Sequence, residues 1–130
     1  MKIKNTMIQA DKIILHNTGI LGNNFKLNPS YEKEIHKDQE NAYILKLFVA
    51  LKNTEENPFP VSLEVCFTSR FEFEDSKNEK EIMAYLNISA IQMIFPYIRA
   101  CITNIFSAAL LPPLVLPIID VRNFKDRLIV

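Results

Sequence analysis

An apolar stretch at residues 89–110 constrains the fold of this chain more than any other feature. Its apolar side chains recur at steps of three and four residues, which places them on one face of a helix. They are Ile91, Ile94, Ile98, Cys101, Ile105 and Ala108. Ser89 and Gln92 have the spacing of a capping box, so we predict that the helix begins at Ser89. Pro112 and Pro113 cannot continue a helix and predict its end.

The helix leads into a proline-rich loop, residues 111–119, that stays strongly apolar. Its prolines favour an extended backbone, and the side chains of an extended segment alternate between two sides. We therefore expect Leu111, Leu114 and Leu116 to point alternately toward the sheet and toward a groove. Two interpretations are open: the loop folds back on the sheet as core, or its lip borders a groove that holds another polypeptide.

A membrane span is the main rival interpretation, because the predicted helix is long enough to cross a bilayer. Arg99 lies near its middle, and a charge at the bilayer centre costs about 2.5–3.5 kcal/mol even on the most lenient scale. The prolines that follow would leave carbonyl groups unpaired in lipid. We therefore expect a buried helix and no membrane span.

Four upstream segments carry β-strand signals. They span residues 3–16, 25–36, 42–52 and 61–74. Pro29 cannot donate to a strand ladder, so the second strand should lie at a sheet edge or be interrupted there. Four strands followed by one helix predict the α+β class: a four-stranded antiparallel sheet packed against one long helix, in a single domain over residues 1–130.

Two motifs at fixed spacing resemble the SecB protein-export chaperone family. Residues 95–102 read FPYIRACI, and residues 111–118 read LPPLVLPI. In that family a phenylalanine-proline-tyrosine helix with a downstream arginine leads into a proline-containing, apolar helix-connecting loop. The resemblance implies an ATP-independent holdase that binds unfolded or precursor polypeptides in a hydrophobic groove, in protein export. It also implies a SecB-like dimer of dimers.

Apolar surface also points to a homo-oligomer. Both faces of the predicted strand at residues 42–52 are apolar, as is most of the predicted helix. A single helix packed on one face of the sheet cannot cover all of this apolar surface. We therefore expect a tetramer, as in the family, or at least a dimer.

The resemblance suggests which residues line the groove. Tyr97 matches the groove tyrosine of the family motif, Leu111 stands where the family often has phenylalanine, and Val61 lies near a groove phenylalanine of the fourth strand. At Leu111 and Val61 this chain lacks the aromatic residues of the family, and other aromatic side chains can compensate for them. They are Phe25, Phe67 and Phe71. With Leu114 and Leu116, these residues make up the predicted peptide-binding set.

Arg99 needs a partner, because an unpaired buried charge is costly. We expect a structural ion pair within an oligomer interface. The alternative is direct contact with a bound ligand.

Coupling to the translocation motor SecA is expected to be weak or absent. In the family, acidic residues on the exposed sheet face and the C-terminal region make that contact. Glu64 matches one acidic sheet position, whereas the other acidic positions fall near Asn17 and Leu21. The ten residues after Asp120 are too few for the second helix and acidic tail of longer family members.

Several classes of function find no support in the sequence. The formal net charge is zero and no basic run interleaves with aromatic residues, which argues against nucleic-acid binding. His16 and His36 have no companion motif, and Glu72 and Glu74 on one strand face resemble a solvated surface more than an acid–base pair. Phosphate-binding loops and metal-ligand spacings are missing. We therefore expect no enzyme activity, no cofactor and no metal.

The cysteines and the N-terminal sequence favour a cytoplasmic location. Cys66 and Cys101 read as small buried hydrophobes of a reducing compartment rather than as a disulfide or metal pair. The first residues, MKIKNTMIQADK, contain no continuous apolar core before their charges, so no signal peptide is expected.

Three hypotheses about function follow. The leading one is a SecB-like holdase with many clients. The second is a dedicated chaperone for one partner, such as the antitoxin of a toxin–antitoxin system. The third is a non-chaperone interaction or small-ligand domain on the same fold.

Overall fold

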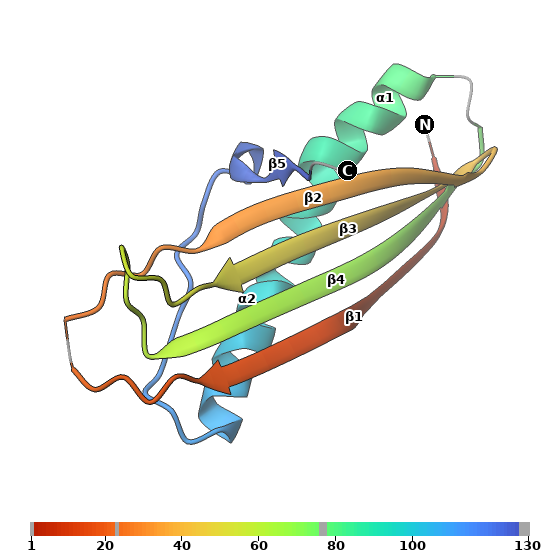
Figure 1. Cartoon of the computed structure of the whole chain (residues 1–130). Coiled ribbons are helices and arrows are strands. Elements are labelled where there is room, and N and C mark those ends of the chain that lie inside the picture. The colour runs from red at the N-terminus through yellow and green to blue at the C-terminus, as the bar shows by residue number, and fades with distance from the viewer. Residues whose placement is uncertain (1, 23, 76–77, 128–130) are drawn as a thin grey trace.

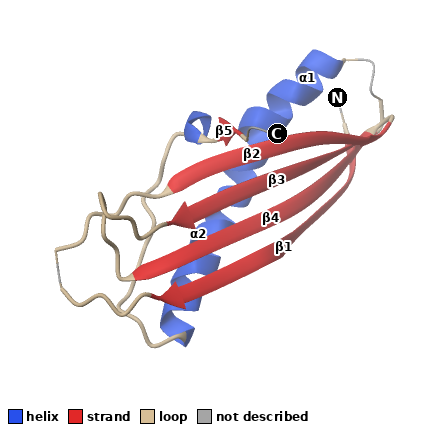
Figure 2. Cartoon of the chain, viewed as in Figure 1, coloured by secondary structure: helices blue, strands red, loops and turns tan. Residues whose placement is uncertain are grey.

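One layer of the structure is a β-sheet and the other is a long helix that crosses one face of the sheet (Figure 1, Figure 2). The computed structural model describes residues 2–22, 24–75 and 78–127. The strands are β1 (Ile3–Asn17), β2 (Ser30–Gln39), β3 (Ala42–Leu51), β4 (Val61–Phe73) and β5 (Lys125–Asp126). The predicted α+β class is confirmed, although the sheet has five strands rather than the four expected.

The strand order is β1-β4-β3-β2-β5. Strands β2, β3 and β4 are consecutive antiparallel neighbours, and β1 pairs antiparallel with β4. The chain must therefore cross the end of the sheet between β1 and β2, which is a Greek-key connection. We call residues 18–29 the crossover loop. Strand β5 pairs in parallel with β2 over only two residues, Glu32 and Lys33, and was not predicted.

The second strand begins later than predicted. β2 starts at Ser30, directly after Pro29, so the predicted start at residue 25 is wrong. Proline has no amide hydrogen for a ladder bond, and the pairing of β2 with β3 begins only at Ser30. Phe25 and Leu27 consequently lie in the crossover loop and not in the sheet.

The helix begins earlier than predicted. Its segments are α1 (Glu79–Ala84), a π-helical turn (Tyr85–Ser89) and α2 (Ala90–Ala108), which follow one another without a break. Asn78 is the N-cap, and its side chain accepts a hydrogen bond from the amide of Glu81 at 3.1 Å. Ser89 has helical backbone angles and caps nothing, so the predicted start at Ser89 is wrong. The apolar face simply continues upstream through Ile82 and Leu86.

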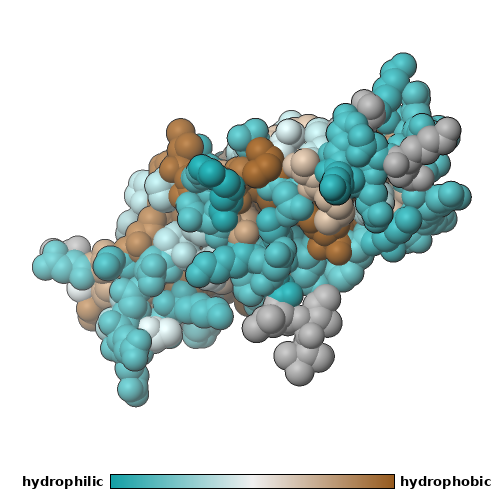
Figure 3. Space-filling model, turned by 90° about the horizontal axis from the view of Figure 1, so that it is seen from above, coloured by the Kyte–Doolittle hydropathy of each residue, from teal (hydrophilic) through white to brown (hydrophobic). Residues whose placement is uncertain are grey.

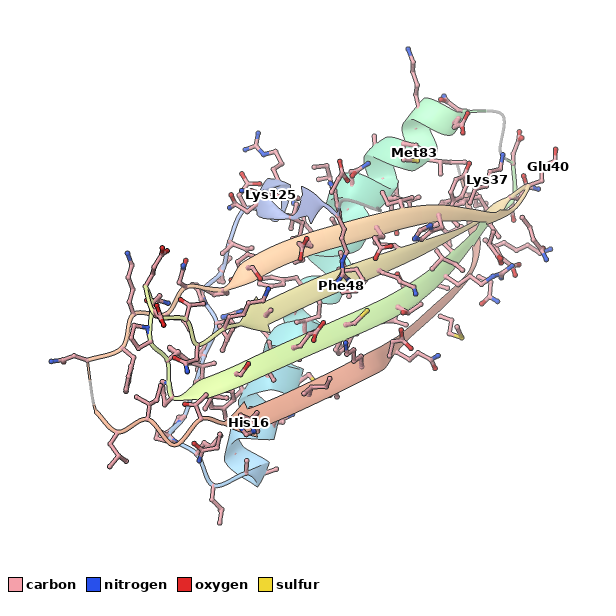
Figure 4. All side chains as sticks on the ribbon, in the orientation of Figure 1. His16, Lys37, Glu40, Phe48, Met83 and Lys125 are labelled. Atoms are coloured by element: carbon pink, nitrogen blue, oxygen red, sulfur yellow. The ribbon has the colours of Figure 1, made fainter. Side chains whose placement is uncertain are left out.

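The core lies between the helix and the facing side of the sheet. On β3 the alternate side chains from Tyr43 to Leu51 are buried, as their spacing of two predicts. They pack with the buried face of the helix. That face consists of Ile82, Leu86, Ala90, Ile91, Ile94, Phe95, Ile98, Ile102 and Phe106. Phe48 lies on the opposite side of the sheet (Figure 4), where the guanidinium of Arg127 covers its ring at 4.1 Å from the centroid.

By length and composition, residues 79–108 meet the criteria for a membrane-spanning helix. The core helix of a globular protein meets the same criteria. Here one face of this helix is buried against the sheet, which accounts for the apolar side chains on that face.

Two apolar surfaces stay uncovered. On the helix, Ile88, Met93 and Tyr97 face away from the sheet. On β1, which forms the other edge of the sheet, Met7 and Ile13 are among the half-exposed apolar residues. On the face seen from above, hydrophobic patches lie between hydrophilic side chains (Figure 3).

We predict that the chain self-associates to cover these surfaces. A long unpaired edge strand readily pairs with another chain, and an exposed apolar helix face favours packing against a second helix. Light scattering at micromolar concentration should therefore give the mass of a tetramer, or at least a dimer. A mass near the 15.0 kDa of a single chain would contradict this prediction.

Candidate functional site

An extended segment runs back along α2 after the helix ends. We call residues 111–119 the strap. Thr103 Oγ1 donates a hydrogen bond to the carbonyl oxygen of Leu114 at 2.9 Å, and Arg99 Nε donates to that of Leu116, also at 2.9 Å. Residues four apart on a helix rise by about 6 Å, and residues two apart in an extended chain by about 6.6 Å. The two spacings match, so the helix holds the strap in one register.

This register decides which strap side chains are buried. Leu114 and Leu116 are two residues apart and therefore lie on the same side, toward the helix and sheet. Leu116 is 0% exposed, whereas Val115 between them is 65% exposed. The expectation that Leu116 faces a groove is therefore wrong. For this residue, the interpretation that the loop folds back as core is the right one.

An apolar pocket of about 630 Å³ lies at the end of the sheet where β1 ends. Its lining residues come from the crossover loop, the segment leading into β4, the last turn of α2 and the start of the strap. These segments lie at the same end of the sheet (Figure 1). Its principal apolar side chains are Leu21, Phe25, Phe59, Val61, Leu111 and Leu114. Among the described residues that line it, none is charged. Its size and apolar lining are typical of a binding site.

The crossover loop is held at its base and shaped by two glycines. Thr18 Oγ1 donates to the carbonyl oxygen of Pro60 at 2.8 Å, which joins the loop to the segment before β4. Gly19 and Gly22 have φ values of +76° and +144°, which side-chain-bearing residues rarely adopt. A Cβ at Gly22 would lie only 3.2 Å from the ring of Phe25. The glycines thus permit the tight loop that presents Leu21 and seats Phe25 in the pocket wall.

Four residues of the predicted peptide-binding set meet at this pocket: Phe25, Val61, Leu111 and Leu114. Val61 is buried and contributes to the floor, and the other three are half-buried. They come from three segments that are far apart in the sequence.

The other four predicted residues lie elsewhere. Tyr97, 60% exposed, and Phe67 border a shallow depression of about 560 Å³ on the other side of α2. Phe71 is 0% exposed and packs edge-to-face against Tyr85, with ring centroids 5.8 Å apart. Phe71 and Leu116 therefore belong to the core, and their prediction as surface groove residues is wrong.

The pocket residues that sequence reasoning missed include Leu21, Phe59 and Phe106. Phe106 follows the same three- and four-residue spacing as the buried residues of the helix, so its spacing does not distinguish a pocket residue from a core residue. Leu21 offered a signal, because an Ile-Leu pair between two glycines in a loop has no local reason to be apolar. Leu21 is 94% exposed.

The ion pair expected for Arg99 is not found among the described residues. Arg99 donates instead to the Leu116 carbonyl, so its role within the chain is to hold the strap. Burial raises the pKa of the Tyr31 hydroxyl above its ordinary value, and the positive charge of Arg99 opposes this shift. At the end of the strap, hydrogen bonds from Arg122 lower the pKa of Asp120 to about 2.

The remaining polar candidates lie outside the pocket. Glu64 is on the open face of the sheet and forms an ion pair with Lys12 at 3.2 Å. Cys66 and Cys101 are unpaired, and burial raises the pKa of both thiols. Within residues 2–22, 24–75 and 78–127, no group of three His, Cys, Asp or Glu side chains is placed to hold a metal ion.

Comparison with known proteins identifies the family of this chain. The family model described as preprotein translocase subunit SecB matches residues 19–126, from the crossover loop to β5. The chain belongs to the SecB family. The predicted resemblance is therefore confirmed.

Two known proteins are similar to this chain over most of its length. The uncharacterized protein MJ0357 of Methanocaldococcus jannaschii is 28% identical over 98% of this chain and 84% of its own length. Among solved structures, the SecB-like chaperone Rv1957 of Mycobacterium tuberculosis, in complex with a ChAD peptide from the HigA1 antitoxin, superposes with a TM-score of 0.74. It is 17% identical, and the match covers 92% of this chain and 90% of the Mycobacterium chain. The fold is therefore shared although most side chains differ.

We predict that substitutions at two neighbouring strap positions differ strongly in their effect on stability. Leu116→Ala should lower the free energy of unfolding by about 2–5 kcal/mol, because it leaves a cavity in the core. Val115→Ala is the matched control and should change it by less than about 0.5 kcal/mol, because Val115 faces solvent. Urea denaturation measures both. Equal effects at the two positions would show that the strap does not hold this register in solution.

Proposed function

We propose that this SecB-family protein is an ATP-independent holdase that captures non-native polypeptide in the apolar pocket formed by the crossover loop and the start of the strap. The observation that carries the proposal is an open, uncharged pocket whose rim includes Leu21, an almost fully exposed leucine. A soluble chain gains nothing by exposing apolar side chains at the mouth of an apolar pocket unless a partner covers them. Capture through such contacts needs no nucleotide.

The energetics favour several sites acting together. Each large apolar side chain that a client buries contributes roughly 1.5–3 kcal/mol. Fixing each client residue costs roughly 1–2 kcal/mol in backbone entropy. A single pocket therefore holds an unfolded chain weakly. The proposed oligomer would offer several copies of the pocket to one client, and linked sites bind far more tightly than one.

A dedicated chaperone of a toxin–antitoxin system is the second candidate. It is favoured by the structural relative from Mycobacterium tuberculosis, which was solved with a peptide from an antitoxin. Such a protein would use the same pocket but accept one partner. A non-chaperone interaction or small-ligand domain is the third candidate, and it would not suppress aggregation of any unfolded protein.

We propose the cytoplasm as the working compartment. Cys66 and Cys101 are free thiols, and a reducing compartment favours that state.

Aggregation assays with several unrelated, chemically denatured proteins test the proposal. We expect the wild type to suppress aggregation of most of them, because apolar contacts do not read a specific sequence. Suppression of one client alone would favour the dedicated chaperone, and suppression of none would favour the third candidate.

A pair of exposed positions makes this test specific to the pocket. Leu21→Ser should reduce suppression severalfold while leaving the melting temperature unchanged, because Leu21 makes few contacts within the chain. Ile118→Ser is the control: Ile118 is 82% exposed but lies outside the pocket. If Leu21→Ser is as active as the wild type, the pocket is not the capture site.

We propose that coupling to SecA is weak. The acidic candidate Glu64 is about two-fifths exposed and is already paired with Lys12. An exposed ion pair of this kind is worth about 1 kcal/mol or less, too little to hold a partner. Titration calorimetry with SecA should therefore detect no micromolar binding. Micromolar binding that Glu64→Gln abolishes would contradict this expectation.

A further inference from the structure

The end of α2 has an unusual residue in a strained backbone conformation. The helix closes with a Schellman motif, in which the amide of Leu111 donates to the carbonyl oxygen of Phe106 at 3.0 Å and the amide of Leu110 donates to that of Ser107 at 3.1 Å. This motif places Leu110 in the left-handed region, with φ at 58°. Glycine is the usual residue at that position, because a Cβ is unfavourable there.

Folding of the single chain does not explain a leucine at this position. Leu110 is 93% exposed, so its side chain gains almost no packing in return for the strain. Glycine at the same place would relieve the strain and remove an exposed apolar group. Strain at an exposed residue points instead to a contact outside the chain.

The neighbourhood of Leu110 indicates what that contact is. The next residue, Leu111, and the Schellman partner Phe106 both line the apolar pocket. On the crossover loop, Leu21 also lines it and is exposed to the same degree. The pocket and its rim are apolar and, within the described residues, carry no charge, which matches an apolar stretch of polypeptide.

We propose that Leu110 is a client-contacting residue that selects segments with apolar side chains at alternating positions. This inference rests on the proposed holdase function. In an extended client, side chains two residues apart lie on the same side, about 6.6 Å apart. One apolar side chain enters the pocket between Leu21 and Leu111, and the next one along the client packs on Leu110. The strain at Leu110 is retained because this second contact requires a large apolar side chain.

Leu110→Gly separates a client contact from a structural role. It should raise the melting temperature by about 2–4 °C, because the left-handed conformation no longer carries a strained side chain. It should also weaken binding about tenfold for a fluorescein-labelled peptide in which leucine and serine alternate, measured by fluorescence anisotropy. Leu110→Met is the matched control and should leave both quantities near their wild-type values, because it keeps a large apolar side chain in the same backbone.

A second peptide tests the spacing. When alternate leucines are replaced so that apolar residues lie four apart, the wild type and Leu110→Gly should bind it equally, because no side chain reaches Leu110. Light scattering on every variant should give the wild-type mass.

The outcomes distinguish this inference from the proposed function. If Leu110→Gly melts at a higher temperature but binds the alternating peptide as tightly as the wild type, Leu110 is not a client-contacting residue. The holdase proposal would still stand. A lower oligomeric mass for Leu110→Gly would also overturn the role of Leu110, because the leucine would then belong to a contact between copies of the chain. If the wild type captures neither peptide nor denatured proteins, the holdase proposal fails and this inference fails with it.

Discussion

Two side-chain hydrogen bonds from the helix to the backbone of the strap organise the candidate site. Thr103 and Arg99 lie one turn apart and hold the carbonyl groups of Leu114 and Leu116. Because an extended chain repeats at nearly the same distance, the helix surface acts as a template for the strap. This arrangement buries Leu116, leaves Val115 in solvent and fixes Leu111 and Leu114 in the wall of the pocket. It also gives Arg99 a backbone hydrogen-bond acceptor within its own chain.

The pocket shows how a small domain presents apolar surface without losing its core. The core side chains lie between the helix and one face of the sheet. The residues that line the pocket come from loops at one end of the sheet and from the end of α2, and these segments lie near one another in the fold (Figure 2). Thr18 and the two glycines stabilise the crossover loop there, and the strap closes the opposite wall. Leu21 and Leu110 are both almost fully exposed; Leu21 lies between two glycines, and Leu110 has a left-handed backbone conformation.

Membership in the SecB family is compatible with large changes in side chains. The structural relative shares only 17% of its residues with this chain, yet the match covers nine-tenths of both chains. The alternating pattern of the strands and the periodic face of the helix need only apolar side chains of suitable volume, which many sequences provide. The pocket instead depends on individual side chains, so relatives with the same fold can differ in what they bind. This is why we derive the proposed client preference from Leu21, Leu110 and the strap rather than from the fold.

The sequence by itself determined the features that depend on near neighbours. The spacing of two along β3 and the spacing of three and four along α2 identified the buried faces, because side-chain direction follows directly from local backbone geometry. The prolines of the strap predicted an extended segment, because proline restricts φ and lacks an amide hydrogen. The family resemblance also rested on short local motifs, and it held.

Only the tertiary structure decided the features that depend on contacts between distant residues. Asn78 rather than Ser89 caps the helix, because the packing of Ile82 and Leu86 on the sheet extends the helix upstream. Phe25, Val61 and Leu111 meet in one pocket while Phe71 is buried in the core, although all four are large apolar residues in similar local patterns. The pairing of β5 with β2 and the hydrogen bond from Arg99 to Leu116 join segments that are distant in the sequence. Nothing in the sequence of either segment predicts these contacts. Local sequence sets which way a side chain can point, and the packing of the whole chain sets what it meets there.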